Sequence, residues 1–282
     1  MSLGFDPISE LALPDGTTVE ERDLVTDTDV IIGGQSQIEF GVRGRNIMAG
    51  ERVHFGGHIE ATEDCRLDMW SSVGGNVLVG ADAYLGERVS VDGRLMVSGD
   101  LDIGDDVQIE DGFEANGWIV IRNPMPTIVF LFIYLTQLLR VGDENAVEEV
   151  LDELVQSETD AEQPLCIPRG AEVSDDRWLV STPARIGEDC RLHGNIRAAE
   201  LHVGANTELF GSLRARGDID IAAEAIIHGD VTTRNNVTLA EGVEVRGDVA
   251  CQDVELGEGT AIDGEIRASG SVTFAGDLDP VE

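Results

Sequence analysis

Two histidines occupy equivalent places in a repeated pattern and raise the question of a metal site. His193 and His228 each directly precede a glycine of a motif that recurs about every 18 residues. They are 35 residues apart, or two repeats, so stacked strands would hold them roughly 9.6 Å apart. Two ligands of one zinc ion lie about 2 Å from the metal and so within about 4 Å of each other. With no third histidine in reach, we predict that one chain forms no metal site.

The other residues that could do chemistry show no pattern typical of catalysis. His54 and His58 are close enough in sequence to form a pair, and His202 is expected to face outward on another strand. An acyltransferase would need a catalytic histidine beside a cofactor groove, and no histidine lies on a long loop. No glycine-rich phosphate loop, nucleophile elbow or paired-carboxylate motif stands out. We therefore predict a protein that is not an enzyme, with no catalytic, cofactor-binding or metal-binding residues and no cofactor.

The charge of the chain is strongly one-sided. Of the 282 residues, 55 are acidic and 19 are basic, all of these arginine, for a formal net charge of −36. Such a chain repels itself in dilute buffer, whereas molar salt shortens the Debye length to roughly 3 Å and screens the repulsion. This composition is typical of a halophile that accumulates salt, a haloarchaeon above all; an acidic surface for a basic partner is the alternative. Without a basic patch to displace counterions, nucleic acid is not expected as a partner.

The N-terminus and the cysteines bear on the compartment. The first residues, MSLGFDPISE, have neither a positively charged region nor an apolar core, so we expect no secretory signal. The four cysteines form no CxxC pairs. Cys65, Cys190 and Cys251 stand where other repeats have apolar residues, and we predict that they are small core residues. We expect a cytoplasmic protein, either free or peripheral to the cell membrane.

A repeat of 17 or 18 residues organises most of the chain and would position any functional side chain. Its apolar members fall into four columns: Val42, Ile59, Val77, Leu95 and Phe113; Ile32, Ala49, Leu67, Leu85, Ile103 and Ile121; Ile196, Leu213, Val231, Val249 and Ile266; and Ile186, Val203, Ile221, Leu239, Leu256 and Phe274. Between the columns, apolar residues recur every six positions, and Gly, Asp and Asn separate the short apolar runs. These runs are typical of strands joined by tight turns rather than of helices.

The period predicts the fold. A coil of about 18 residues with an apolar residue every six is a triangular all-β solenoid with three short faces per coil. One coil cannot bury its own inner row, but stacked coils bury a continuous column and satisfy each other's backbone hydrogen bonds. We predict a leader or cap at 1–23, a first solenoid block at 24–123, an insert with an acidic linker at 124–172 and a second block at 173–282. The sequence leaves open the hand of the coil and whether the two blocks form one rod.

The phrase V-x-G-x-[IV] recurs through the second block, at residues 209–213, 227–231, 245–249 and 262–266. These repeats resemble the bactofilin family of polymer-forming cytoskeletal proteins, and most closely their haloarchaeal relatives, the halofilins. The resemblance is best over 184–276 and weaker over 30–121. It implies a right-handed β-helix, head-to-head and tail-to-tail polymerisation without nucleotide, and a role in cell shape. The chain departs from ordinary bactofilins in having two solenoid blocks and an insert.

The insert contains the most apolar run of the chain, TIVFLFIYLTQLLR at 127–140. As a helix it would span about 21 Å, short of the roughly 30 Å of bilayer hydrocarbon, so we do not expect it to cross a membrane. A helical stripe follows it, and together they predict a short α-helical hairpin at 127–157. Three hypotheses compete: packing against the solenoid or between the blocks, docking to a partner or second subunit, and contact with the inner membrane surface. The residues expected to make a partner or membrane contact are Val129, Phe130, Phe132, Ile133 and Leu135.

The last coil of the second block is the other candidate for function. A solenoid end presents unpaired strand backbone and an exposed slice of core. No amphipathic cap follows Phe274 in the sequence. We predict a polymerisation interface of Val272 and Phe274, with Leu256 and Ile266 behind them. The alternative is that Phe274 is an ordinary core residue covered by the acidic tail.

Taken together, these features predict a non-enzymatic, bactofilin-like scaffold that self-assembles end to end and contributes to cell shape in a haloarchaeon. Its expected partners are further copies of itself and either other cell-shape proteins or the inner membrane surface, but neither nucleic acid nor nucleotide. One alternative is a hexapeptide-type solenoid enzyme, either an acyltransferase or a γ-carbonic anhydrase-like protein. Another is a monomeric adaptor that docks partners through the 127–157 hairpin.

Overall fold

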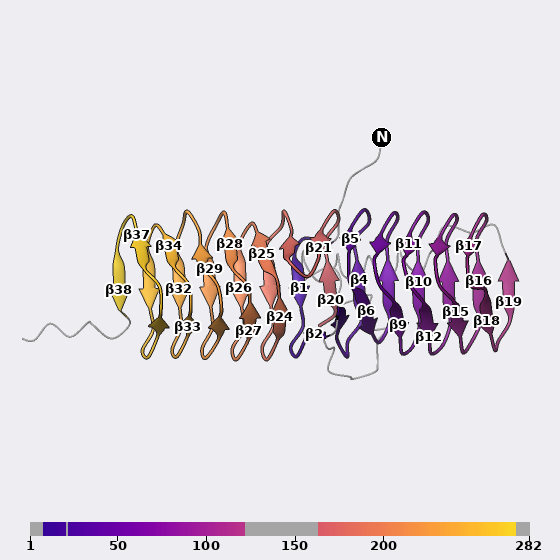
Figure 1. Cartoon of the computed structure of the whole chain (residues 1–282), viewed down its shortest axis with the longest axis horizontal. Helices are drawn as coiled ribbons and strands as arrows, with labels where there is room; N and C mark the ends of the chain where they lie inside the picture. The colour runs from indigo at the N-terminus through magenta and orange to yellow at the C-terminus, as the bar shows by residue number, and fades with distance from the viewer. Residues whose placement is uncertain (1–7, 21, 122–162, 275–282) are drawn as a thin grey trace, which may run out of the picture.

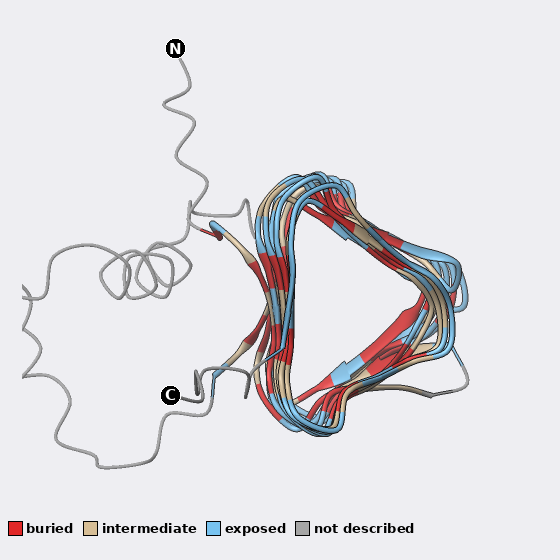
Figure 2. Cartoon of the chain, turned by 90° about the vertical axis from the view of Figure 1, so that its left-hand side faces the viewer, coloured by how far each residue is buried: buried red, intermediate tan, exposed pale blue. Residues whose placement is uncertain are grey.

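The part of the chain that the structure describes is one long β-solenoid (Figure 1). The computed structural model describes residues 8–20, 22–121 and 163–274, which form 38 strands and no helix. Seen along its axis, the solenoid is triangular, with one sheet on each side (Figure 2). Neighbouring coils pair residues 18 apart, such as Cys65 with Ala83, so the predicted all-β solenoid and its period are confirmed. The hairpin predicted at 127–157 lies outside the described residues.

Each of the three sheets runs the whole length of the rod. In order along the rod, the first sheet consists of β19 (Ile119–Ile121), β16 (Leu101–Ile103), β13 (Ala83–Leu85), β10 (Cys65–Leu67), β7 (Ile47–Ala49), β4 (Val30–Ile32), β20 (Leu165–Ile167), β1 (Leu11–Leu13), β23 (Ala184–Ile186), β26 (Leu201–Val203), β29 (Ile219–Ile221), β32 (Val237–Leu239), β35 (Val254–Leu256) and β38 (Val272–Phe274). The second sheet consists of β17 (Gln108–Ile109), β14 (Ser90–Val91), β11 (Ser72–Val73), β8 (His54–Phe55), β5 (Gln37–Ile38), β21 (Glu172–Val173), β22 (Arg177–Leu179), β25 (Asn195–Ala198), β28 (Leu213–Ala215), β31 (Val231–Thr232), β34 (Val249–Cys251) and β37 (Ile266–Ala268). The third sheet consists of β18 (Phe113–Ala115), β15 (Leu95–Val97), β12 (Val77–Val79), β9 (Ile59–Ala61), β6 (Gly41–Gly44), β3 (Asp23–Val25), β2 (Thr18–Glu20), β24 (Arg191–His193), β27 (Glu208–Phe210), β30 (Ile226–Ile227), β33 (Glu244–Val245) and β36 (Ala261–Ile262).

The apolar columns of the sequence form the core. Strand pairing aligns each column in register, as in Leu67 with Leu85 and Leu239 with Leu256. Because side chains alternate between the faces of a strand, the outer members of each triplet enter the core and the middle one faces outward. Leu67 and Leu85 are fully buried. The first sheet has 14 strands, which at about 4.8 Å per strand makes a rod of roughly 62 Å.

The two blocks meet head to head and form a single rod. Within each block the strands are parallel, but at the junction β1 pairs antiparallel with β20, β2 with β3, and β21 with β22. The strand order is continuous through the junction in all three sheets. The coils therefore wind away from the junction in both directions, and each end of the rod is the C-terminal end of one block (Figure 1).

Two segments that are distant in sequence build the junction. Strands β1 and β2, from the predicted leader at 1–23, continue the second block, whereas β20 and β21, from the predicted linker at 124–172, continue the first. Trp178 on β22 is fully buried, and its ring lies 6.2 Å from that of Phe40. Its indole Nε1 donates a hydrogen bond to the carbonyl of His193 at 3.0 Å. The junction is thus a packed core in which both segments take part.

Glycines allow the coils to approach at the corners. A Cβ on Gly247 would lie 2.6 Å from the backbone oxygen of Gly229, closer than any real contact. The left-handed corner position, by contrast, is held in the first block by other residues, namely Gln35, Arg52, Trp70, Arg88 and Asp106. Gly247 and its equivalents Gly211, Gly229 and Gly264 are therefore required by the close approach of neighbouring coils, whereas Gly112 and Gly194 have a positive φ.

Part of the acidic content holds neighbouring coils together. The Asp82 carboxylate accepts a hydrogen bond from the Asp100 backbone N–H at 2.7 Å, and the Asp100 carboxylate accepts one from Trp118 at 2.7 Å. In the second block, Asp248 donates in the same way to Asp230 at 2.9 Å. Such charge-assisted bonds are stronger than those between neutral groups. These carboxylates therefore have a structural role as well as their effect on net charge.

Candidate functional site at the two ends of the rod

The predicted interface of the second block lies at one end of the rod. Phe274 is 61% exposed and Val272 is 43% exposed on the terminal strand β38, and Ile266 is 38% exposed on β37. Leu256 lies one coil further in and is only 6% exposed. Phe274 pairs with Leu256 on its inner side. The first three residues therefore form the end surface, and Leu256 supports it from below.

The opposite end carries a second apolar surface that the sequence analysis did not single out. Trp118 is 80% exposed, Ile119 46% and Phe113 43%, in the coil that contains β18 and β19. Phe113 is the last member of one repeat column, as Phe274 is of another. The same reasoning from an uncapped last coil would have found it, had it been applied to the block that precedes the insert.

Large exposed apolar side chains concentrate at these two ends. In the described ranges, eight large hydrophobic residues are exposed, and the other two are Trp70 and Met96 on the sides of the rod. A solenoid side face can hold polar residues at every outward position, whereas the core column has to emerge at each end. We call Phe113, Trp118 and Ile119 the first end surface, and Ile266, Val272 and Phe274 the second end surface.

The terminal strands are also open edges. Within the described part of the chain, β17, β18 and β19 at one end and β36, β37 and β38 at the other have a strand neighbour on one side only. An open edge offers unpaired N–H and C=O groups to another chain. Both ends of the rod are C-terminal ends of their blocks, and the two blocks wind with the same hand. If two copies met end to end on a common axis, their facing strands would therefore run antiparallel. The junction inside the chain already does this in all three sheets.

Charged groups border both end surfaces. At the first end, Glu114 lies 3.8 Å from Arg94. At the second end, the Arg267 guanidinium pairs with Glu265 at 2.8 Å and with Asp248 at 3.3 Å. The net charge of −36 makes the approach of two copies repulsive at low ionic strength. Association through these apolar centres should therefore depend on salt.

Comparison with known proteins adds no relative. No protein-family model, curated protein or solved structure matches this chain. Within the described ranges, no helix is long and apolar enough to cross a bilayer. The residues proposed for partner or membrane contact, Val129, Phe130, Phe132, Ile133 and Leu135, lie outside these ranges. The two end surfaces are therefore the candidate site.

The histidines lie apart from one another. Phe210 stacks between His193 and His228, with ring centroids 4.8 Å and 4.2 Å away, so the two imidazoles do not share a ligand position. His228 Nε2 lies 3.0 Å from a Glu208 carboxylate oxygen. The described residues contain no group of three His, Cys, Asp or Glu side chains that could hold a metal ion. His54 and His58, considered as a pair, bond to Ser72 and to the backbone of Asn76 respectively.

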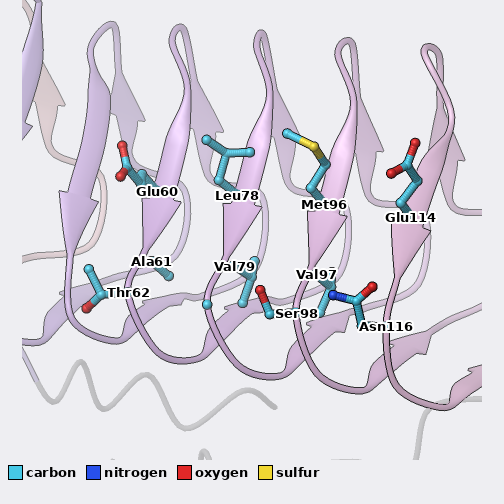
Figure 3. A pocket seen from close by; sticks show the side chains of 11 residues that line it. Glu60, Ala61, Thr62, Leu78, Val79, Met96, Val97, Ser98, Glu114 and Asn116 are labelled. Carbon is cyan, nitrogen blue, oxygen red and sulfur yellow. The ribbon is translucent and has the colours of Figure 1, made fainter.

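A shallow groove of about 480 Å³ lies on the side of the first block. Outward side chains of β9, β12, β15 and β18 line it, with Leu78 and Met96 at its centre and Glu60 and Glu114 at either end (Figure 3). It contains no histidine or cysteine. The groove offers apolar contact between two carboxylates, with the hydroxyls of Thr62 and Ser98 beside it.

The cysteines are core or partly covered residues, and none forms a disulfide. Cys65, Cys190 and Cys251 are buried as predicted. Burial, with a contribution from Asp64, raises the pKa of Cys65 to about 12. Burial, with Glu10 adding to it, raises that of Cys166 to about 11. Neutral thiols of this kind are poor nucleophiles at neutral pH.

Proposed function

We propose that this protein is a non-enzymatic scaffold that assembles end to end into filaments. The observation that carries the proposal is the coincidence of open strand edges and exposed apolar residues at both ends of a single rod. A rod with one such end could form only pairs. Two such ends allow each copy to bind two others, which is the minimum needed for a polymer.

The junction supports this proposal because it shows, within one chain, the kind of edge-to-edge contact that we propose between two copies. There, two coil edges of this chain pair antiparallel, and Trp178, Leu24 and Leu11 are fully buried between them. Two copies that meet at their ends would place C-terminal coil edges against each other, where the junction places N-terminal ones, and their strands would likewise be antiparallel. No nucleotide is needed, since the association comes from apolar burial and backbone hydrogen bonds.

The resemblance to bactofilins and halofilins gives the proposal its finer detail. It adds a right-handed winding of the coils, contacts between like ends, a cytoplasmic location and a role in cell shape. The lysine-free, acidic composition fits a haloarchaeal cytoplasm, where molar salt screens the charge. Other cell-shape proteins or the inner membrane surface are the further partners included in the proposal.

The test is sedimentation velocity of the full chain in about 2 M KCl, where the Debye length is below about 3 Å, with electron microscopy of any fast fraction. We expect filaments from the native chain. The double variant Trp118→Arg with Phe274→Arg should sediment as a monomer with unchanged circular dichroism, because each charge would be buried unpaired in a contact.

The matched control is Met96→Arg, since Met96 is 38% exposed, as Ile266 is, but lies on the side of the rod. It should leave the filaments intact. Filaments that persist in the double variant would contradict end-to-end assembly. A native chain that is a clean monomer would instead favour the adaptor function, and a discrete trimer would favour a solenoid enzyme.

A further inference from the structure

The outer face of the first sheet differs between the two blocks. In the first block, the outward residues of β4, β7, β10, β13 and β16 stand in register and form what we call the first outer ladder: Ile31, Met48, Arg66, Tyr84 and Asp102. In the second block, β23, β26, β29, β32, β35 and β38 give the second outer ladder: Arg185, His202, Asp220, Thr238, Glu255 and Thr273. The first contains Ile31, Met48 and Tyr84 beside two charged residues, whereas the second contains no apolar residue.

Burial also differs between the two ladders, although Asp220 and Thr238 of the second are partly buried as well. Ile31 is only 8% exposed although it faces outward, and Met48, Arg66, Tyr84 and Asp102 are all partly buried. The Arg66 guanidinium lies over the Tyr84 ring at 3.9 Å, which leaves its aliphatic stem along the sheet. In the second outer ladder, Arg185, His202, Glu255 and Thr273 are exposed. The covered apolar groups of Ile31, Met48 and Tyr84 on one side face need an explanation.

The connection between β19 and β20 offers an explanation for these covered apolar groups. The chain leaves the first block after β19 and next appears in the described structure at β20, in the same sheet and six strands away, or about 29 Å along the rod. Residues 122–162 have to span this distance. In the second block no described strand follows β38, so the described residues include no connection that has to return along its first sheet.

The direction in which the chain winds also indicates that this connection crosses the outer face of the first sheet rather than that of the second or third. In the first block the chain passes from the first sheet to the second, then to the third and back, as in β4, β5, β6 and β7. It therefore leaves β19 at the edge that borders the second sheet and enters β20 from the edge that borders the third. The direct path between these points crosses the outer face of the first sheet diagonally, over the first outer ladder. A path over the other two faces would be longer.

We propose that the first outer ladder is the docking surface for residues 127–140 of the same chain. This run, TIVFLFIYLTQLLR, is the most apolar in the sequence and belongs to the returning connection. The ladder from Ile31 to Asp102 covers four strand spacings, about 19 Å, and 14 residues span about 21 Å if helical. The occupant is thus of the right chemistry, length and position. The inference is independent of end-to-end assembly.

A photo-crosslinker tests the contact directly. In the full chain in molar KCl, p-benzoylphenylalanine in place of Met48 should give, on irradiation, a product of monomer mass whose linked peptide falls within 127–140. The same group in place of Thr238, at the matching outward position of the second block, should give no such product. Links from position 48 to a second copy, or none at all, would overturn the proposal.

A second measurement does not depend on crosslinking. Amide exchange in 127–140 should become about tenfold faster in Met48→Glu, because a buried carboxylate weakens the docking, while exchange in β32 and β35 stays unchanged. Thr238→Glu should leave the exchange of 127–140 as in the native chain. Equal exchange in both variants would refute docking on this ladder. Protection that arises only when anionic vesicles are added would assign the run to a membrane instead.

Discussion

The junction between the blocks and the two ends of the rod are edges of the same kind of coil in different surroundings. At the junction, Trp178 is fully buried beneath an antiparallel strand partner. At the first end, Trp118 is 80% exposed, and β19 has no partner on its outer side within the described chain. The comparison shows that the apolar residues of a coil edge become fully buried where a second coil edge pairs with it. At the ends no second edge is present in the described chain, and in our proposal a second copy of the chain provides it.

The largest expected effect sharpens this comparison. Trp178→Ala should lower the free energy of unfolding by about 3–5 kcal/mol, because it leaves a cavity at the junction and removes a ring. Trp118→Ala should change it by no more than about 0.5 kcal/mol, because that side chain is exposed. Guanidinium unfolding of both variants, at a concentration where each is monomeric, gives the two values. Similar losses in both would mean that Trp118 is already packed within one chain.

The next effect distinguishes the way in which ends pair. If like ends meet, as the bactofilin resemblance implies, Phe274→Arg alone leaves the first end surface free, and the variant should sediment as a dimer. Trp118→Arg alone should likewise leave dimers joined through the second end surface. If unlike ends met, either variant alone would be a monomer, because every contact would include a blocked end. Sedimentation velocity of the single variants therefore decides between the two arrangements.

Much of the fold could be predicted from the sequence because the solenoid repeats the same local rule. Each member of a column, such as Leu67, Leu85 or Leu239, has the same neighbours one coil away, so the period alone places it in the core. The junction could not be predicted in this way. Its pairs, such as Ala12 with Cys166, are antiparallel, join segments far apart in sequence and follow no period.

The candidate site was predictable only in part, for a related reason. Phe274 was found because it is the last apolar residue of a column in the last coil. Phe113 satisfies the same condition, but the chain continues past it, so nothing local marks its coil as an end. Trp118 belongs to no column, since it stands at the corner position that Asp82 and Asp100 hold in earlier coils. Only the strand order shows that no strand lies beyond β19 in the described structure. The hairpin prediction for 127–157 stays a prediction.

A smaller effect concerns salt. With a net charge of −36, two approaching ends repel each other across a Debye length of about 10 Å at 0.1 M salt, which falls to roughly 3 Å at 1 M. Filament formation should therefore increase with KCl concentration. The native chain and Met96→Arg should assemble above the same threshold KCl concentration. The double variant Trp118→Arg with Phe274→Arg should not assemble at any KCl concentration. Light scattering during a KCl titration measures this; assembly that weakens as salt rises would argue against apolar end contacts.

The smallest expected effect tests how firmly the last coil is held to the one beneath it. Hydrogen bonds from the Ser271 side chain and backbone N–H lower the pKa of Asp253 below its ordinary value of 3.8. A lowered folded-state pKa means that the bonds stabilise the coil at neutral pH and are lost as the pH falls through that pKa. Asp253→Ala should therefore speed amide exchange at Ser271 and leave exchange at Asp100, held by Asp82 inside the first block, unchanged. Asp253→Asn keeps an acceptor oxygen, so its exchange rate at Ser271 should lie between those of the native chain and Asp253→Ala. It should lack the acid-induced shift of the Ser271 amide resonance that we expect of the native chain below the ordinary aspartate pKa of 3.8. Equal exchange at Ser271 in all three proteins would mean that strand pairing with β35 alone holds the end in place.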